Sequence, residues 1–411
     1  GIILFIIPFF WLKPGEMNLG GDAGRLYFYD PNSFLKNYTL YNFTASGKGV
    51  ESIGYVFSSY TFFLYLLKFI FQSSTILIGI SNGLVLSVGF LSVYFIIQEL
   101  IGTREFGLKK RVIDYSSILA GLFYVLSPEL TTGGWANPIL SHNQFFLNPF
   151  IFLLVLKFFL TKNNLYAIAV LLITVVFAVN FSFAGAPTFF SFYPLALAFL
   201  FCYIKYIRKL SIPYKRVGFG LLLFLLLHAF HLFPELSAVF SFTSAVSKTV
   251  FLVDGASSRG GLDYFTAIAS STKVSFSWMS LNQGEKNSLF AVYMIVPLVL
   301  VGGFYFNKGK TLLLSGIFFL IALFFDTANI TDTGFFFYKL LFRIPGFSMF
   351  RNFHGQWVYV FMFFYTILFG QAIAIVANRL SRCLAFAFIG SFFMFIILFG
   401  IPFLNGSIPM P

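Results

Sequence analysis

Charged side chains are scarce in this chain of 411 residues, where Asp, Glu, Lys and Arg together make up only 10%. A soluble domain has about 25% charged residues, which keep its surface hydrated. Hydrophobic residues reach 58% here. This composition excludes a water-soluble globular protein and a disordered chain. It predicts a protein embedded in a membrane.

Cysteine is almost absent, with only Cys202 and Cys383 in the chain. Two cysteines so far apart exclude a disulfide scaffold and a cysteine-based metal motif. The net charge of +13 can suggest a nucleic-acid partner. The apolar content favours a lipid bilayer as the partner instead, so the positions of the positive charges become the informative feature.

Apolar segments are abundant, and a helix that crosses the ~30 Å hydrocarbon core needs about 20 such residues. The segments are 1–12, 55–72, 75–101, 115–128, 145–160, 165–182, 187–207, 217–237, 288–306, 311–326, 355–377 and 384–404. The first is too short to cross, and the chain begins with Gly1. We therefore expect an N-terminally truncated first helix.

Lys and Arg collect in short links between these segments. The links and their basic residues are 102–113 (Arg104, Lys109, Lys110, Arg111), 161–164 (Lys162), 205–216 (Lys205, Arg208, Lys209, Lys215, Arg216), 307–310 (Lys308, Lys310) and 378–383 (Arg379, Arg382). Positively charged short loops stay on the cytoplasmic side of a membrane. We therefore predict that these links lie inside. The loops that alternate with them, 129–144, 183–186, 238–287 and 327–354, are predicted to lie outside.

The alternation of outer loops and inner links fails once. If loop 13–54 is outside and link 102–113 is inside, the chain crosses the membrane an odd number of times between them. The segments 55–72 and 75–101 therefore cannot both cross. The segment 55–72 carries Lys68 and is predicted to be a re-entrant or interfacial helix. The prediction is thus an all-α, polytopic bundle of about 11 transmembrane helices. The whole chain, 1–411, forms one transmembrane unit with long outer loops at 13–54, 238–287 and 327–354.

The acidic residues lie mainly on the predicted outer side, since only Glu99, Glu105 and Asp114 fall near the cytoplasmic face. Long outer loops with acids suggest an external working surface. Asp22 stands among glycines in loop 13–54, where its carboxylate can take a proton from a hydroxyl, bind a divalent cation or simply cap a turn. Asp30-Pro31 predicts a helix start, with Asp as N-cap and Pro first in the helix.

Two arginines and a histidine run against the charge bias in the predicted outer loop 327–354. Arg351 and His354 stand three apart at the mouth of a helix. Helix N-termini favour anions, and Arg presents a fork to phosphate oxygens. The pair predicts either a lipid-phosphate site or snorkelling toward ordinary lipid head groups.

The remaining histidines form no metal cluster in the sequence. His228 and His231 lie i, i+3 on one helix and are followed by Glu235; they favour the lining of a polar cavity over a zinc site, which lacks a third ligand nearby. His142 lies in an outer loop rich in amides and aromatics. Such a loop suits sugar hydroxyls or an interfacial aromatic belt. We expect Arg25, Tyr55, His142 and Glu235 to contribute to substrate binding.

No catalytic serine elbow, phosphate-binding glycine loop or nucleotide fingerprint occurs in the sequence. A transfer reaction on the outer side would then need an activated donor that contains no nucleotide. Sugars linked to a lipid phosphate are such donors. A transporter or flippase of lipid-linked sugars is the alternative function, and a structural scaffold of the envelope is a third.

Three stretches resemble membrane-embedded glycosyltransferases of the GT-C class, and in particular the α-(1→3)-arabinofuranosyltransferase family. They are Asp22 with the run 29–35 (YDPNSFL), the run 54–57 (GYVF) with Phe62 and Phe63, and the run 351–354 (RNFH); the run 124–128 (YVLSP) is also similar to a family segment that ends a span. The likeness is spread over most of the chain.

The resemblance implies transfer of a sugar, arabinofuranose in that family, from a polyprenyl-phosphate donor to a cell-envelope glycan on the outer face of the plasma membrane. It implies that Asp22 is the general base and that Arg351, Asn352 and His354 hold the donor phosphate. No cofactor is expected with certainty, and a role for a divalent cation stays open. The expected partners are the lipid-linked donor, the glycan acceptor and the bilayer, with no nucleic acid.

Overall fold

The computed structural model describes residues 1–11, 26–36, 58–102, 106–127, 146–182, 190–233, 236, 295–328, 332–341, 343–344, 347, 350 and 353–405. Within these residues every regular element is a helix, and no strand occurs. The predicted all-α class is therefore confirmed for the part of the chain that is described.

Helices occupy the predicted apolar segments. They are α1 (Ile2–Ile6), η1 (Ile7–Phe10), α2 (Leu26–Tyr29), α3 (Pro31–Phe34), α4 (Ser58–Phe71), α5 (Ser74–Ile101), α6 (Lys110–Leu126), α8 (Leu147–Thr161), α9 (Asn164–Val176), η6 (Ala178–Phe181), α11 (Phe192–Cys202), the π-helix η7 (Tyr203–Ile207), α12 (Tyr214–Leu227), α16 (Ile295–Phe306), α17 (Lys310–Thr327), α18 (Asp332–Leu341), α19 (Phe353–Arg379) and α20 (Arg382–Leu404). The sequence analysis missed α18, which lies inside the predicted outer loop 327–354.

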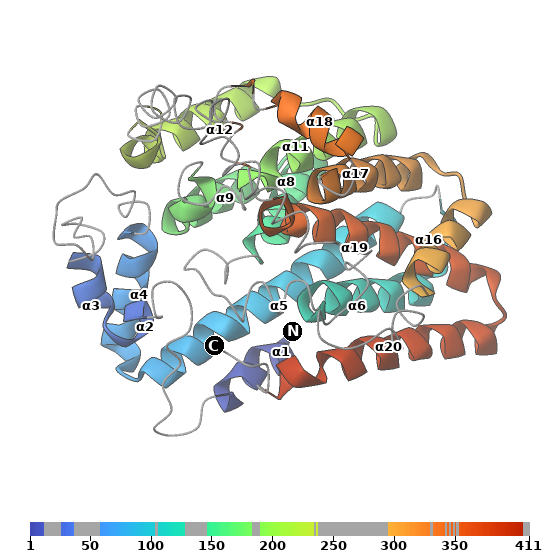
Figure 1. The fold of residues 1–411 in the computed structure, drawn as a ribbon, viewed down its shortest axis with the longest axis horizontal. Helices are drawn as coiled ribbons and strands as arrows, with labels where there is room; N and C mark the ends of the chain where they lie inside the picture. The colour runs from blue at the N-terminus through green and yellow to red at the C-terminus, as the bar shows by residue number, and fades with distance from the viewer. Residues whose placement is uncertain are drawn as a thin grey trace.

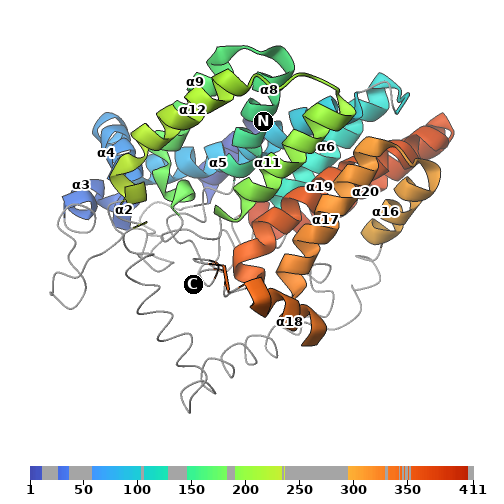
Figure 2. The same cartoon turned by 90° about the horizontal axis from the view of Figure 1, so that it is seen from above.

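Helix α19 is the centre of the bundle, with α5 and α6 on one side and α17 on the other (Figure 1). Its sequence is apolar all round, which is typical of a helix buried on every side. Figure 2 shows α9 and α12 side by side at one flank and α16 at the other. The hydrophobic core therefore follows α19 along its length.

Among the described residues, three helical stretches are long and apolar enough to cross a membrane: Ser74–Ile101, Lys310–Thr327 and Gln356–Arg379. The other apolar helices in this part of the chain are shorter. Small residues bring α19 close to its neighbours. A Cβ atom added to Gly303 of α16 would lie 2.8 Å from the Cβ of Ala372, and one on Gly370 would lie 2.9 Å from that of Ala120. Such contacts are how helices pack tightly in lipid.

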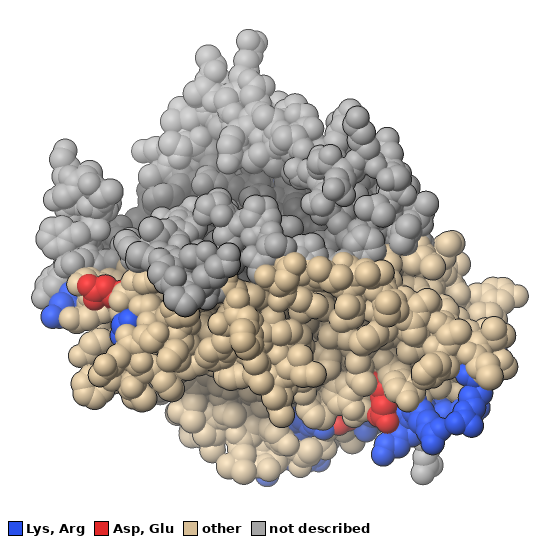
Figure 3. Space-filling view, turned by 90° about the horizontal axis from the view of Figure 1, so that it is seen from below, with Lys and Arg blue, Asp and Glu red and all other residues tan. Residues whose placement is uncertain are grey.

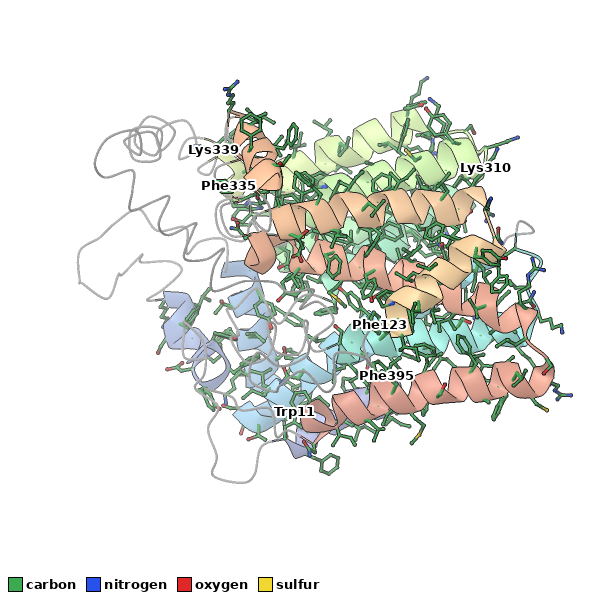
Figure 4. The ribbon with its side chains drawn as sticks, turned by 45° about the vertical axis from the view of Figure 1, so that its right-hand side comes forward. Trp11, Phe123, Lys310, Phe335, Lys339 and Phe395 are labelled. Carbon is green, nitrogen blue, oxygen red and sulfur yellow. The ribbon has the colours of Figure 1, made fainter. Side chains whose placement is uncertain are left out.

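The basic links gather at one end of the bundle, which we call the basic end. It comprises the turns between α5 and α6, α8 and α9, η7 and α12, α16 and α17, and α19 and α20. Figure 3 shows blue side chains along its lower edge, with a broad uncharged face above them. Figure 4 shows Lys310 at this end and Lys339, on α18, at the opposite end. The clustering is the arrangement that the sequence pattern predicts.

Side chains at the basic end are paired. Lys157 of α8 forms an ion pair with Glu99 of α5, whose backbone carbonyl accepts a hydrogen bond from the Tyr203 hydroxyl at 3.2 Å. The Gln98 amide donates to the Asp114 carboxylate at 2.9 Å. These bonds join α5, α6, α8 and η7 at this end.

Helix α4 runs crosswise to α5 at the opposite end of the bundle (Figure 1). The two are joined by Gln72 and Ser73, and the left-handed backbone of Gln72 (φ 53°) allows the sharp change of direction. Lys68 of α4 donates to the Ser74 hydroxyl at 2.5 Å. Helix α4 is therefore not aligned with α5.

The predicted helix start at Asp30-Pro31 is confirmed. Asp30 is the N-cap of α3, Pro31 is its first residue, and the Asp30 carboxylate accepts a hydrogen bond from the Ser33 backbone N–H at 3.0 Å. Hydrogen bonds from Ser33 lower the pKa of Asp30. The YDPNSFL run thus has a local structural role.

Candidate functional site

Most of the predicted site residues lie outside the described part of the chain. These are Asp22, Arg25, Tyr55, His142, Glu235, Arg351 and Asn352. His354 is in the first turn of α19, where the backbone is described and the side chain is not. The helix mouth predicted next to Arg351 does exist, since α19 begins at Phe353. The chemical roles assigned to these residues remain predictions.

An aromatic cluster fixes the chain just before this helix mouth. Trp357 of α19 stacks on Phe325 of α17, with ring centroids 4.3 Å apart and planes inclined by 15°. The Trp357 indole N–H donates to the Tyr338 hydroxyl at 2.9 Å, and that hydroxyl donates to the Phe350 carbonyl. Phe347 also packs against Trp357 and Tyr338. We call Phe325, Tyr338, Phe347, Phe350 and Trp357 the aromatic clamp.

The aromatic clamp holds Phe350, the residue before Arg351, between α17, α18 and α19. Burial raises the pKa of the Tyr338 hydroxyl, which therefore stays neutral and can donate to Phe350. The clamp also explains why α18 forms. Tyr338 of α18 is fully buried and packs against Phe325 near the end of α17, whereas Phe336 and Phe337 are exposed.

A buried carboxylate lies beside the clamp. Asp326 is fully buried and is the neighbour of Phe325 in the last turn of α17. Asp326 was not predicted as a site residue because it stands at the edge of an apolar segment. An acidic residue inside an apolar segment could have marked it as a candidate, because buried carboxylates in membrane helices are costly and commonly functional.

Two amide side chains form the most unusual feature at the end opposite the basic end. Asn148 lies in the first turn of α8 and Asn180 in η6, and both are 0% exposed. Neither the oxygen nor the nitrogen of either amide has a hydrogen-bond partner. Their neighbours Phe146 and Phe177 meet edge to face at 6.1 Å. We call Asn148 and Asn180 the amide pair.

A tyrosine extends this unpaired group. Tyr193 of α11 stacks on Phe181, the residue after Asn180, with ring centroids 4.6 Å apart. Its hydroxyl has no hydrogen-bond partner. Helix α11 packs against α8, so Asn148, Asn180 and Tyr193 come from elements that are in contact at this end of the bundle.

The two histidines predicted to line a cavity are buried and paired. His228 Nδ1 and His231 Nε2 are 2.8 Å apart, and His228 Nε2 is 3.0 Å from the Thr174 hydroxyl of α9. The His228 ring also packs against Phe224 and lies 5.6 Å from Phe181. The helix is interrupted at His228, where α12 ends. The i, i+3 spacing had predicted that the two histidines share one face of an unbroken helix, and they do not.

These groups form a polar belt of Asn148, Thr174, Asn180, Tyr193, His228 and His231. Across the described residues, no group of three His, Cys, Asp or Glu side chains is placed to hold a metal ion. The direct hydrogen bond between the two imidazoles shows that they serve each other as partners. The belt therefore offers neutral hydrogen-bonding groups surrounded by aromatic rings.

An apolar groove adjoins the belt. Its walls come from α4, α5, the start of α8 and the chain after α9, and its lining includes Tyr60, Phe63, Leu84, Phe146 and Phe177. The Tyr60 and Ser81 hydroxyls lie 3.3 Å apart in it. Phe146 and Phe177 belong both to the groove and to the surroundings of the amide pair.

The fold and the belt define an all-helical protein with helices able to cross a membrane and a buried polar layer at one end of the bundle. No protein-family model, no curated protein and no solved structure matches the chain. Its function must therefore be argued from its own residues.

Proposed function

We propose that the protein is a multi-pass plasma-membrane glycosyltransferase of GT-C type. It moves a sugar from a polyprenyl-phosphate donor to a cell-envelope glycan on the extracytoplasmic side. The resemblance of the motifs favours arabinofuranose as the sugar. The single observation that carries the proposal is the buried polar belt. It lies at the end of the bundle where α19 begins.

The orientation rests on the basic end. Positive residues favour the cytoplasmic side, so the basic end is inside and the belt is outside. The crosswise course of α4 supports an interfacial helix at the outer surface, which keeps the count at about 11 crossings. The ion pair of Glu99 and Lys157 joins helices at the basic end. Long predicted outer loops and short inner ones favour a transferase that works on one face over the alternative, a flippase of lipid-linked sugars.

The proposed chemistry is a single displacement with inversion. Asp22 takes the proton of an acceptor hydroxyl, and the hydroxyl oxygen forms a bond to the anomeric carbon as the bond from that carbon to the phosphate oxygen breaks. The lipid phosphate leaves with the electron pair. Arg351, Asn352 and His354 stabilise the negative charge that develops on it.

A transfer assay with purified protein and a panel of polyprenyl-phospho-sugars tests the proposal. Asp22→Asn should abolish transfer and keep donor binding, because the amide cannot accept the proton. Arg351→Ala should weaken donor binding by about tenfold or more, the expected loss for one charged hydrogen bond of 1.5–3 kcal/mol. Arg343→Ala is the matched control, since Arg343 is an exposed arginine of the same loop.

Two results would reject this assignment. Wild-type turnover in Asp22→Asn would show that Asp22 is not the general base. Equal losses of donor binding in Arg343→Ala and Arg351→Ala would show that Arg351 acts only through general surface charge. Movement of the donor lipid between leaflets without transfer to an acceptor would favour the flippase instead.

A further inference from the structure

The amide pair and Tyr193 leave five polar atoms buried and unpaired in one region. These are both amide atoms of Asn148, both of Asn180, and the Tyr193 hydroxyl oxygen. Buried polar groups in folded proteins are nearly always hydrogen-bonded, because an unpaired one loses its contacts with water and regains none. A cluster of exceptions indicates that something else supplies the partners.

The unpaired groups stand beside neighbours that are satisfied. His228 is bonded to both His231 and Thr174. The Ser191 hydroxyl, two residues before Tyr193, donates to the Gln356 carbonyl at 2.9 Å. The local packing is therefore able to pair its polar atoms. Other buried side-chain atoms among the described residues also lack partners, for example Ser116 Oγ and Asn378 Oδ1, but Asn148 and Asn180 are the side chains in which both amide atoms do.

The chemistry of the set defines what it binds. Each asparagine offers two donors and one acceptor, and the phenol offers a donor and an acceptor. Sugar hydroxyls also donate and accept at once. The described stretches 146–156, 174–182 and 190–204 contain no Asp, Glu, Lys or Arg. The set is thus suited to an uncharged ligand rich in hydroxyls, because these stretches contain no cationic side chain to neutralise a carboxylate or a phosphate.

We infer that Asn148, Asn180 and Tyr193 form the subsite for a neutral, hydroxyl-bearing sugar ring. The inference rests on the proposed function, since it specifies which part of a lipid-linked sugar this layer recognises. Phe181, which stacks on Tyr193, supplies an aromatic wall next to the amides. The subsite is distinct from the phosphate position assigned to Arg351 and His354. It selects for an uncharged sugar, not for the phosphate.

Binding of octyl glycosides to the full chain in nanodiscs tests the subsite without requiring transfer. The probes are the octyl glycosides of arabinose, glucose, galactose and mannose, and octyl tetraethylene glycol ether is the reference with the same alkyl chain and no sugar ring. At least one glycoside should bind the wild type about tenfold more tightly than the ether. Asn148→Leu and Asn180→Leu should each remove this preference, because leucine keeps the volume and loses the amide.

The control variant is Thr366→Val, which removes another fully buried and unpaired hydroxyl from the interior of α19. It should leave the glycoside preference within about twofold of wild type. Without ligand, Asn148→Leu and Asn180→Leu should melt at the same or a higher temperature than wild type, since an unpaired polar group is being replaced by an apolar one. Tyr193→Phe removes a single oxygen and should fold even if a leucine variant does not.

Several outcomes would overturn the subsite. They are equal binding of the ether and all the glycosides, an unchanged preference in Asn148→Leu, Asn180→Leu and Tyr193→Phe, or a lower melting temperature of the ligand-free leucine variants, which would show that the amides have structural partners. A wild type that binds a glycoside but transfers from no donor would reject the proposed function and keep the subsite. Full transfer by Asn148→Leu, Asn180→Leu and Tyr193→Phe would reject the subsite and keep the proposed function.

Discussion

The amide pair contrasts with the paired polar side chains at the basic end of the bundle. At the basic end, Glu99 pairs with Lys157, and Gln98 donates to Asp114. At the opposite end the amide pair is fully buried and bonded to nothing. Both regions are built from the same helices, among them α8, which carries Lys157 toward one end and Asn148 at the other. The difference therefore does not come from helix type or packing partner.

The contrast separates structure from function. Where a protein needs only to hold helices together, pairing of polar groups inside the bundle stabilises it, because lipid offers no other partner. Where polar groups stay unpaired at a cost in stability, a selected role explains why they persist. The polar pairs at the basic end hold the helices together, and we expect ligands to bind at the opposite end. Four substitutions, ordered by expected effect, test this division.

The largest loss of stability is expected at the aromatic clamp, which is the well-packed part of the ligand-binding end. Trp357→Ala should lower the free energy of unfolding by about 3–5 kcal/mol, because it removes a buried ring stacked at 4.3 Å on Phe325 and leaves a cavity. Chemical denaturation of the detergent-solubilised protein measures this. Trp357→Phe keeps a ring and should lose much less. Equal losses in the two variants would show that the stacking contributes little.

The next largest effect should occur at the basic end. Lys157→Met leaves the Glu99 carboxylate without its partner and should cost about 1–2 kcal/mol, below the value for a fully buried pair because the side chains are 28% and 27% exposed. The double variant Glu99→Gln with Lys157→Met should recover most of the loss. Octyl glycoside binding should not change in either variant. A change in that binding would break the proposed separation of the two ends.

A smaller effect compares a paired with an unpaired hydroxyl. Thr174→Val removes the hydroxyl that bonds both His228 Nε2 and the Leu171 carbonyl and should cost about 1 kcal/mol, the low end of the range for leaving a buried polar group without its partner. Thr366→Val, equally buried and without a partner, should cost nothing or stabilise slightly. Thermal melting of the two variants side by side measures the difference. Loss of stability in Thr366→Val alone would invalidate the use of missing partners to find the ligand site.

The helices were largely predictable from the sequence, and the reason is physical. Long apolar runs separated by basic links are a one-dimensional signal, so the segments 311–326 and 384–404 match α17 and α20 closely. Helix α18 was missed because its ten residues follow a loop and form by packing on the aromatic clamp. The burial of Asp326 depends on neighbours from other helices in the same way.

The polar belt was predictable only in part. The histidines were visible because His is rare in an apolar segment, although their mutual hydrogen bond was not. The amide pair gave no signal, since Asn148 and Asn180 look like ordinary residues near the ends of apolar segments. What makes them unusual is the absence of partners, which is a property of three-dimensional packing. The predicted base and phosphate-binding residues lie outside the described chain, except the backbone of His354, and stay predictions.

The smallest effect should come from Asp30, which has a local role in a region the resemblance had marked as functional. Asp30→Ala removes the N-cap of α3 and should cost at most about 1 kcal/mol. Asp30→Asn is the control, because asparagine caps as well as aspartate. If the YDPNSFL run acted through the Asp30 charge, the two variants would be equally impaired in transfer. If it acts as a cap, only the alanine variant should lose stability.

The pH dependence separates these roles further. The hydrogen bonds from Ser33 lower the pKa of Asp30 in the folded protein below its unfolded value of about 3.9. The stabilisation is therefore present above about pH 4 and is lost as the pH falls through the lowered folded pKa. Melting temperatures of wild type and Asp30→Asn should converge or cross in this acidic range, because the asparagine cap does not titrate. A constant difference between the two proteins down to the acid limit would show that the carboxylate is not what caps α3, and would return Asp30 to the candidates for the working surface at the ligand-binding end.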